Sequence, residues 1–322
     1  MKSWVAGGLA LLASLAASAP TGAETFPNRP LRLIVPYAPG GVLDYTGRQL
    51  AKTMGERLGQ QVVVDNRPGA GGVIGTDLVA HSPPDGYTMV IMDLAIAVNP
   101  SLQKQIPFDV MKDLQPISMV NTSPLVVAVN VATPATDIPS LIAYAKGKPA
   151  GLTFGSAGVG TGPHMAGELF RLQTGAPLIH VAYKGIGPAT TDLVAGQIDL
   201  VFGSVTGTLP FIIDGKLRAL ATTGAKRPGA MPSVPTVAEQ GVAGFDVALW
   251  LMLFGPAGLP PPLLQQLNQE VHGALATPSL VEAFAKVGAE PLPTSPAESS
   301  AFLKVEIDKW ARVVRDANIK PE

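Results

Sequence analysis

The sequence of 322 residues contains no cysteine. A chain without thiols forms no disulfide, offers no cysteine nucleophile or thiolate zinc ligand, and has no N-terminal cysteine for lipid attachment. Charged residues are also few, at 15% of the chain, and the formal net charge is −1. This low and balanced charge excludes a basic nucleic-acid-binding surface, and the 47% hydrophobic content excludes a disordered chain.

The common motifs of catalysis and cofactor binding are also missing. The chain has no G-x-S-x-G nucleophile elbow, no H-E-x-x-H zinc motif and no Walker A sequence. Gly158 and Gly160 resemble the start of a dinucleotide fingerprint, but Pro163 stands in place of its third glycine. The four histidines are far apart in sequence. We therefore expect no enzymatic activity, no cofactor and no metal site.

Residues 1–23 have the features of a secretory signal peptide. Lys2 is followed by an apolar run over residues 4–17 and then by small residues up to Ala23. A membrane anchor is the alternative, but the run is shorter than the roughly 20 residues that span a bilayer. We expect cleavage after Ala23, export to the periplasm and a soluble mature chain.

The mature chain alternates short apolar runs with segments of helical periodicity, which is typical of βαβ units. Glycine and proline residues punctuate these segments as turns. The pattern predicts two α/β lobes, one before and one after about Ser123, with a ligand cleft between them. Strands are predicted at residues 31–35, 62–64, 87–92, 124–129, 152–156, 179–181, 200–202, 217–222 and 247–254. Helices are predicted at residues 43–58, 74–80, 138–146 (capped by Asp137), 164–173, 189–195, 262–276, 280–287 and after the capping box at Ser295.

Three glycine loops follow predicted strands and lead into predicted helices, at residues 39–41, 157–162 and 184–188. The free N–H groups at a helix start bind anions without any basic side chain, and glycine lets the backbone approach a ligand closely. Each loop alone is more typical of an ordinary tight turn than of a binding site. Together the three loops predict an anion-binding cleft.

With their neighbours, these loops resemble the Bug family of periplasmic solute receptors, the substrate-binding component of tripartite tricarboxylate transporters. The resemblance extends from Phe26 to about Trp310, and its motifs occur in order along the chain. The matching segments are residues 30–37, 40–44 with Arg48, 59–72, 84–88, 180–185, 192–193, 196–199, 215–220, 234–239, 256–258 and 309–310.

The resemblance implies an α/β fold of the two-lobed, type II-like periplasmic binding protein class. Each lobe is expected to be a mainly parallel sheet flanked by helices, with the ligand in the interlobe cleft. Lobe 1 is expected to comprise residues 24–123 and 251–322, and lobe 2 residues 124–250.

The implied function is a monomeric periplasmic receptor for a small carboxylate: a dicarboxylate, tricarboxylate or aromatic carboxylate. Glycine-loop N–H groups and bridging waters are expected to bind it, and integral membrane transporter subunits to receive it. A ligand-sensing co-receptor for a membrane kinase and a secreted hydrolase or transferase are the alternatives.

The resemblance also implies a set of ligand contacts from the three loops and one strand end. For several of them a structural role is the alternative: Asp44 starts a helix and pairs with Arg48, His164 stabilises a helix start, and Lys184 is a solvated charge. The predicted contacts are Tyr37, Gly40, Gly41, Asp44, Ala157, Gly158, Gly160, Thr161, His164, Tyr183, Lys184, Gly185 and Ser204.

Three positions depart from the family pattern. Gly203 stands where many relatives carry aspartate, Met252 where a small residue is common, and Asp93 where a small or hydroxyl residue is usual. A missing acid and an added apolar side chain favour a bulkier, more hydrophobic carboxylate such as an aromatic one. The alternative is that these positions face the core.

Overall fold

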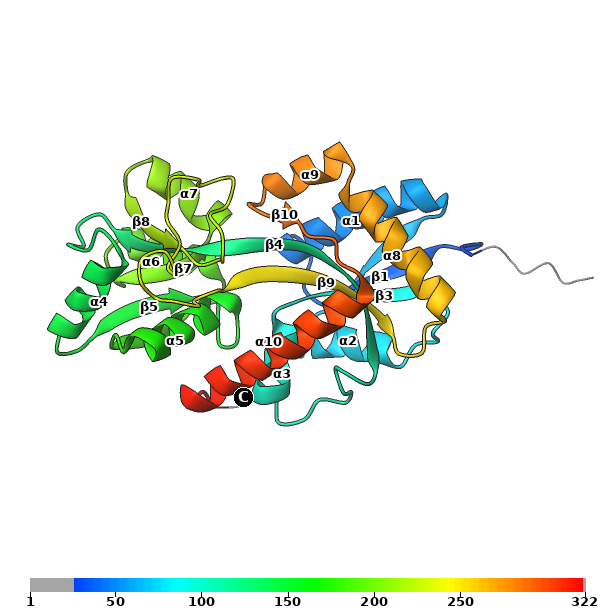
Figure 1. The fold of residues 1–322 in the computed structure, drawn as a ribbon, viewed down its shortest axis with the longest axis horizontal. Coiled ribbons are helices and arrows are strands. Elements are labelled where there is room, and N and C mark those ends of the chain that lie inside the picture. Colours follow the sequence, from blue (N-terminus) through cyan, green and yellow to red (C-terminus); the bar gives the residue numbers. More distant parts are fainter. Residues whose placement is uncertain (1–25, 321–322) are drawn as a thin grey trace, which may run out of the picture.

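The structure, a computed structural model, describes residues 26–320, so the predicted signal peptide lies outside the described residues. Two lobes of mixed sheet flanked by helices are joined by long strands (Figure 1), which confirms the predicted two-lobed α/β class. No helix between residues 26 and 320 is both long enough and apolar enough to cross a bilayer.

The first lobe is built on the parallel strands β2, β1 and β3, which β9 extends in the antiparallel direction. Its core packs on both faces of the sheet, against α1, α8 and α9 on one face and α2, α3 and α10 on the other. The elements are β1 (Leu31–Val35), α1 (Val42–Leu58), β2 (Val62–Asn66), η1 (Ala70–Gly72), α2 (Val73–Ala80), β3 (Thr88–Asp93), α3 (Ala95–Leu102), β9 (Ala248–Pro256), α8 (Pro261–Leu275), α9 (Pro278–Ala285), β10 (Glu290–Pro291) and α10 (Pro296–Asp316).

The second lobe is built on β7, β5 and β6, which run parallel to one another, with α4 and α5 on one face and α6 and α7 on the other. Its elements are α4 (Ile138–Gly147), β5 (Leu152–Ser156), α5 (Gly162–Thr174), β6 (Leu178–Ala182), α6 (Ile186–Val194), β7 (Leu200–Ser204), α7 (Val205–Ile213) and β8 (Leu217–Thr222).

One long strand, β4 (Leu114–Asn130), belongs to both lobes. Its first part, residues 114–124, pairs with β9, and its second part pairs with β7 and β8. All of these pairings are antiparallel. Each lobe therefore has a mixed sheet, in which the parallel strands lie beyond the antiparallel strands that cross between the lobes. The predicted lobe boundaries, 123/124 and 250/251, fall inside β4 and β9 and stay predictions.

Besides the short η1 and β10, the sequence pattern missed three elements: the first part of β4, α3 and α7. Each contains a proline, at Pro116, Pro100 and Pro210 respectively, that reads as a break in an element. The burial of β4 along nearly its whole length outweighs that local signal. The predicted capping residues, in contrast, are confirmed, because Asp137 and Ser295 both accept from the N3 backbone N–H of their helices.

A buried polar cluster fixes the loop that follows β5. Gly158 donates its N–H to Oγ of Ser156 at 3.1 Å, and Ser156 Oγ lies 2.6 Å from Nε2 of His180. Gly160 donates its N–H to Nδ1 of His164 at 3.0 Å, and the two imidazole rings stack with centroids 3.9 Å apart. Burial lowers the pKa of His180 to about 4. Burial, with His180 adding to it, lowers the pKa of His164 to about 3.

A second buried cluster joins the C-terminal helix α10 to β9, one of the two long strands that pass between the lobes. Glu306 on α10 is 6% exposed, and its Oε2 accepts from the indole N–H groups of Trp250 and Trp310 at 3.0 and 2.9 Å. Its Oε1 accepts from Lys309 Nζ at 2.8 Å, and that amine also donates to the carbonyl oxygen of Asp246. One carboxylate therefore links α10 to β9.

Replacing Glu306 by alanine is expected to lower the free energy of unfolding by about 2–5 kcal/mol, because two buried indole N–H groups lose their acceptor. Glu306→Gln keeps an acceptor oxygen and is expected to cost about half as much or less. Urea denaturation with an unchanged m value measures both variants. A Glu306→Ala variant within 0.5 kcal/mol of the parent, a difference typical of neutral surface changes, would contradict this role.

The two low histidine pKa values predict acid sensitivity. As pH falls from 7 to 5, the unfolded state gains protons at these positions and the folded state does not, so the free energy of unfolding falls by about 2 kcal/mol per histidine. His164→Asn retains an acceptor for Gly160 and removes one titrating ring, so this decline is expected to be about 2 kcal/mol smaller. Denaturation at pH 7, 6 and 5 measures it.

The matched control is His81→Asn, which removes an imidazole that is 62% exposed and lies outside this buried cluster. Equal declines in His164→Asn and the parent chain would show that His164 is not held neutral in the folded state.

Candidate functional site

The structure contains two cavities between the lobes, on opposite faces of the ribbon formed by β4 and β9. Leu249 of β9 lines one cavity, whereas its neighbours Ala248 and Trp250 line the other, as alternation along a strand requires. We call the first the cleft cavity, of about 460 Å³, and the second the back cavity, of about 370 Å³.

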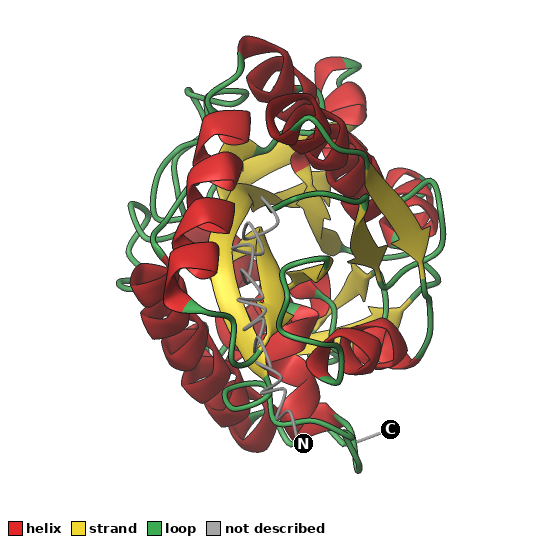
Figure 2. Cartoon of the chain, turned by 90° about the vertical axis from the view of Figure 1, so that its right-hand side faces the viewer, coloured by secondary structure: helices red, strands yellow, loops and turns green. Residues whose placement is uncertain are grey.

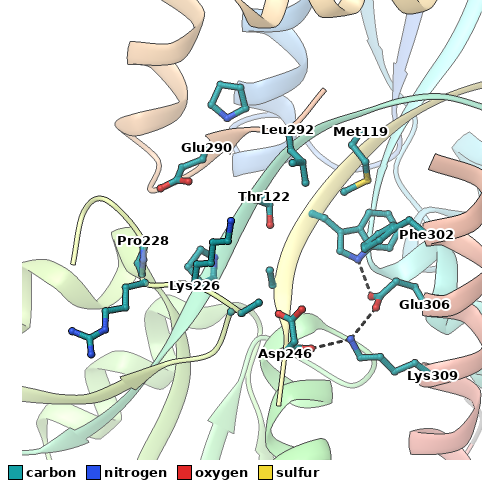
Figure 3. Close-up of a pocket in the computed structure, with 17 residues that line it drawn as sticks. Met119, Thr122, Lys226, Pro228, Asp246, Glu290, Leu292, Phe302, Glu306 and Lys309 are labelled. Atoms are coloured by element: carbon teal, nitrogen blue, oxygen red, sulfur yellow. Dashed lines mark hydrogen bonds and ion pairs between the residues drawn. The ribbon is translucent and has the colours of Figure 1, made fainter. Parts of the chain in front are cut away.

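Six of the seventeen residues that line the back cavity are charged, with both signs present, and most of the others are apolar (Figure 3). Glu306 holds Lys309, and Arg227 is paired with Glu239 at 2.9 Å. The α10 residues that line it come from the middle of the helix, so no helix start faces it from that element. Four of the six charged side chains, those of Arg227, Glu290, Glu306 and Lys309, are held in hydrogen bonds within the protein.

The cleft cavity lies where ligand sites of α/β sheets are found, at the carboxyl ends of parallel strands. Asp93 ends β3, Ala157 follows β5, Ser204 ends β7, and Tyr37 lies just beyond β1. Both lobes therefore contribute to it. The full lining is Tyr37, Val42, Ala70, Gly71, Asp93, Leu94, Ala95, Asn99, Leu102, Gln103, Ala157, Val159, Gly160, Thr161, Gly162, Pro163, Ile186, Ser204 and Leu249.

Three helices begin at this cavity without a capping side chain. Val42, Gly162 and Ile186 are the first residues of α1, α5 and α6, and all three line the cavity. No side chain caps any of these three helix starts. First-turn N–H groups have no partner within their own helix, and the helix dipole places partial positive charge there. The cleft cavity is therefore suited to an anion.

Five of the predicted contacts line this cavity: Tyr37, Ala157, Gly160, Thr161 and Ser204. Their polar groups are partly committed to the protein. Thr161 donates its hydroxyl to the carbonyl oxygen of Gly158 at 2.7 Å, and Ser204 Oγ accepts from Gly207 N–H at 3.2 Å. These hydroxyl groups retain capacity for one further hydrogen bond.

The first loop contains three predicted contacts that do not line the cavity: Gly40, Gly41 and Asp44. Asp44 is buried and accepts from Gly40 N–H, from Arg48 and from Asn66. Burial raises the pKa of Asp44, but these hydrogen bonds and the Arg48 charge outweigh it and hold the pKa below its ordinary value. The alternative role of Asp44, pairing with Arg48 at the helix start, is the one the geometry supports.

The other predicted contacts outside the lining are Gly158, His164, Tyr183, Lys184 and Gly185. The N–H of Gly185 donates to the carbonyl oxygen of Ala157, and the Tyr183 hydroxyl donates to Asp192 at 2.8 Å. Lys184 is exposed. With the Gly158 and Gly160 bonds described above, most of the glycine N–H groups expected to bind the ligand donate within the protein instead.

Sequence reasoning missed the contribution of α3 to the cavity. Asn99 and Leu102 lie on this helix and Gln103 follows it, and Asn99 donates its amide to the carbonyl oxygen of Gly71 at 2.9 Å. An asparagine before a proline predicts a turn, and nothing local marks these residues as a site. The glycine-rich segment 69–72, which the sequence pattern predicts as a turn, also contributes to the site, because Gly71 lines the cavity.

Two of the three unusual positions lie in the core. A Cβ on Gly203 would stand 2.4 Å from the Thr208 methyl group, and Met252 is fully buried. The argument for a hydrophobic ligand from these two residues is therefore wrong, because neither reaches the cleft. Asp93 does line the cleft cavity.

Asp93 and Tyr37 form a polar pair in the first-lobe wall. The Tyr37 hydroxyl donates to Oδ1 of Asp93 at 3.0 Å, and the Ala95 N–H donates to the same oxygen at 3.0 Å. Burial raises the pKa of Asp93 above its ordinary value despite these bonds. Burial and the adjacent carboxylate raise the pKa of Tyr37 well above its ordinary value.

Known proteins share this fold and much of this sequence. Residues 46–319 match the tripartite tricarboxylate transporter family receptor, TctC. The chain is 40% identical to Protein BugT of Bordetella pertussis over 311 residues, which cover 96% of this chain and 95% of BugT.

Two solved structures of similar fold are described with a carboxylate. The structure of R. palustris Rpa4515 with adipate has a TM-score of 0.79 and 33% identity, covering 92% of this chain and 100% of that one. MatC (Rpa3494) from Rhodopseudomonas palustris with bound malate has a TM-score of 0.75 and 29% identity, covering 90% and 100%. As the sequence motifs predict, the chain belongs to the TctC family of tripartite tricarboxylate transporter receptors and is a relative of the Bug proteins.

Proposed function

We propose that this protein is a periplasmic receptor that binds a small carboxylate in the cleft cavity and delivers it to the membrane subunits of a tripartite transporter. The observation that carries the proposal is the meeting of three helix starts without capping side chains at one interlobe cavity. Backbone N–H groups at such positions are good partners for a carboxylate. The adipate and malate bound to the two R. palustris proteins support the same ligand class.

The binding mode that we propose differs from donation by the glycine loops. Gly40, Gly158, Gly160 and Gly185 have their N–H groups engaged, so we assign the carboxylate to the first-turn N–H groups of α5 and α6, at Gly162 and Ile186, with bridging waters. Packing also requires glycine at 162, since a Cβ there would lie 2.1 Å from the Leu249 side chain.

The walls of the cleft cavity favour a ligand with an apolar body. Val42 from one lobe and Val159 from the other are 54% and 38% exposed, although both line the cavity. A ligand held between the lobes would cover these side chains and gain from their burial. Closure of the lobes over the ligand would then change the surface that the membrane subunits meet. Delivery in the periplasm also requires that the predicted signal peptide be functional.

Ligand binding can be tested on ligand-stripped protein by thermal melting against aliphatic and aromatic carboxylates. A ligand present at about one hundred times its dissociation constant is expected to add roughly 2.7 kcal/mol to the free energy of unfolding. The corresponding primary amides serve as controls, because they lack the negative charge, and should leave the melting temperature unchanged. If no carboxylate raises the melting temperature, the proposed ligand class is wrong.

The role of α6 can be tested with Ile186→Pro, which removes the first N–H of the helix. Proline is well tolerated at this position, and Gly185 has the extended ψ of 163° that a residue before proline needs. Loss of one hydrogen bond to a charged ligand is expected to weaken carboxylate binding about 10- to 100-fold in calorimetry.

The matched control is Ile186→Ala, which loses the same side chain but keeps the N–H, and we expect its affinity to stay within about threefold of the parent value. Equal losses in the two variants would assign the effect to the side chain and remove the helix start from the binding mode.

A further inference from the structure

The two walls of the cleft cavity differ in charge. Of its nineteen lining residues, Asp93 in the first-lobe wall is the only one with a charged side chain. The first-lobe wall presents the start of α1, at Val42, together with Asp93. The second-lobe wall comes from the loop after β5, Ile186 and Ser204, and it presents the starts of α5 and α6 without any acidic group. An anionic group is therefore favoured at the second-lobe wall and disfavoured near Asp93.

Asp93 retains an accepting atom for a ligand. The two hydrogen bonds that it accepts from other residues, the Tyr37 hydroxyl and the Ala95 N–H, both end on Oδ1, so neither uses Oδ2, and its own backbone N–H also donates to the carboxylate. No lysine or arginine is among the residues that line the cavity, so no cation there offsets the carboxylate. Burial accordingly raises the pKa of Asp93. A carboxylate in this state is stabilised by any further donor and destabilised by a second negative charge.

Asp44, the other acid at this end of the first lobe, shows the contrast. Both of its oxygens accept hydrogen bonds, Oδ2 from Gly40 and Arg48 and Oδ1 from Asn66, and its side chain does not line the cavity. Asp44 is thus occupied in holding its own loop. Capping of α3 accounts for only one of the two oxygens of Asp93.

We propose that Asp93 determines ligand specificity by accepting a hydrogen bond from a hydroxyl or ammonium group at the end of the ligand opposite its carboxylate. The proposal rests on the proposed function, because it assumes that the carboxylate binds at α5 and α6. The ligand class is then a monocarboxylate with a terminal hydroxyl or amino group and an apolar body, in preference to a dicarboxylate or tricarboxylate.

The test is calorimetry at pH 7 with four ligands that share one carbon skeleton: hexanoate, 6-hydroxyhexanoate, 6-aminohexanoate and hexanedioate, together with the four- and five-carbon series. At the best chain length, the hydroxy or amino acid is expected to bind at least about tenfold more tightly than both the unsubstituted acid and the dicarboxylate. The hydroxy and amino compounds separate a neutral donor from a cationic one, and tight binding of either supports the proposal.

Asp93→Asn keeps an acceptor oxygen for Tyr37 and Ala95 and removes the charge. We expect this variant to lose most of the preference for the donor-bearing ligand and to bind the dicarboxylate about tenfold more tightly than the parent does. Asp93→Ser tests the same point with a smaller neutral side chain. Asp65→Asn is the matched control, because Asp65 pairs with Arg32 and Arg67 away from the cavity, and it should leave the ligand order unchanged.

The outcomes separate this proposal from the proposed function. Carboxylate binding in which the parent chain prefers the dicarboxylate would overturn the role of Asp93 and leave the receptor assignment standing. The same holds if Asp93→Asn and Asp93→Ser both retain the parent order of ligands. Absence of binding by every carboxylate, in the parent chain and the variants alike, would overturn both. The order measured on the parent chain decides the question even if a variant fails to fold.

Discussion

The continuity of β4 is the constraint on which the rest of the structure depends. This single strand is hydrogen-bonded to β9 in one lobe and to β7 and β8 in the other, so the sheets of the two lobes share one strand. The strands β4 and β9 run together between the lobes (Figure 1), and the view along the molecule shows the strands enclosed by helices (Figure 2). Each face of the ribbon formed by β4 and β9 is the floor of an interlobe cavity, with Leu249 on one side and Trp250 on the other. On the back face, Glu306 joins α10 to this ribbon through the two indole groups.

The chemistry of the cleft cavity comes mainly from the backbone. Helix starts supply partial positive charge without any arginine or lysine, which agrees with a chain in which charged residues are scarce. Backbone donors recognise a carboxylate without fixing the rest of the ligand. Discrimination must then come from the apolar walls and from Asp93, the one charged group in the lining. In the proposed binding mode, general affinity and specificity thus have separate structural origins.

Several polar side chains that look like ligand contacts in the sequence serve the loops instead. His164 holds the N–H of Gly160, and Asp44 holds the N–H of Gly40. Sequence pattern located these loops correctly but did not distinguish a residue that faces the ligand from one that supports the loop from behind. The residue types and spacings are the same in both roles, and only the direction of the side chain separates them.

The sequence by itself determined the order of most strands and helices, the caps at Asp137 and Ser295, and the membership of a receptor family, because these depend on local periodicity, capping and motif order. Tertiary structure alone decided which residues meet in the cleft. Asp93, Gly162 and Leu249 are far apart in the chain and come together only because β3, α5 and β9 end or pass at one cavity. For the same reason Gly203 and Met252, which stand out in the sequence, belong to the core.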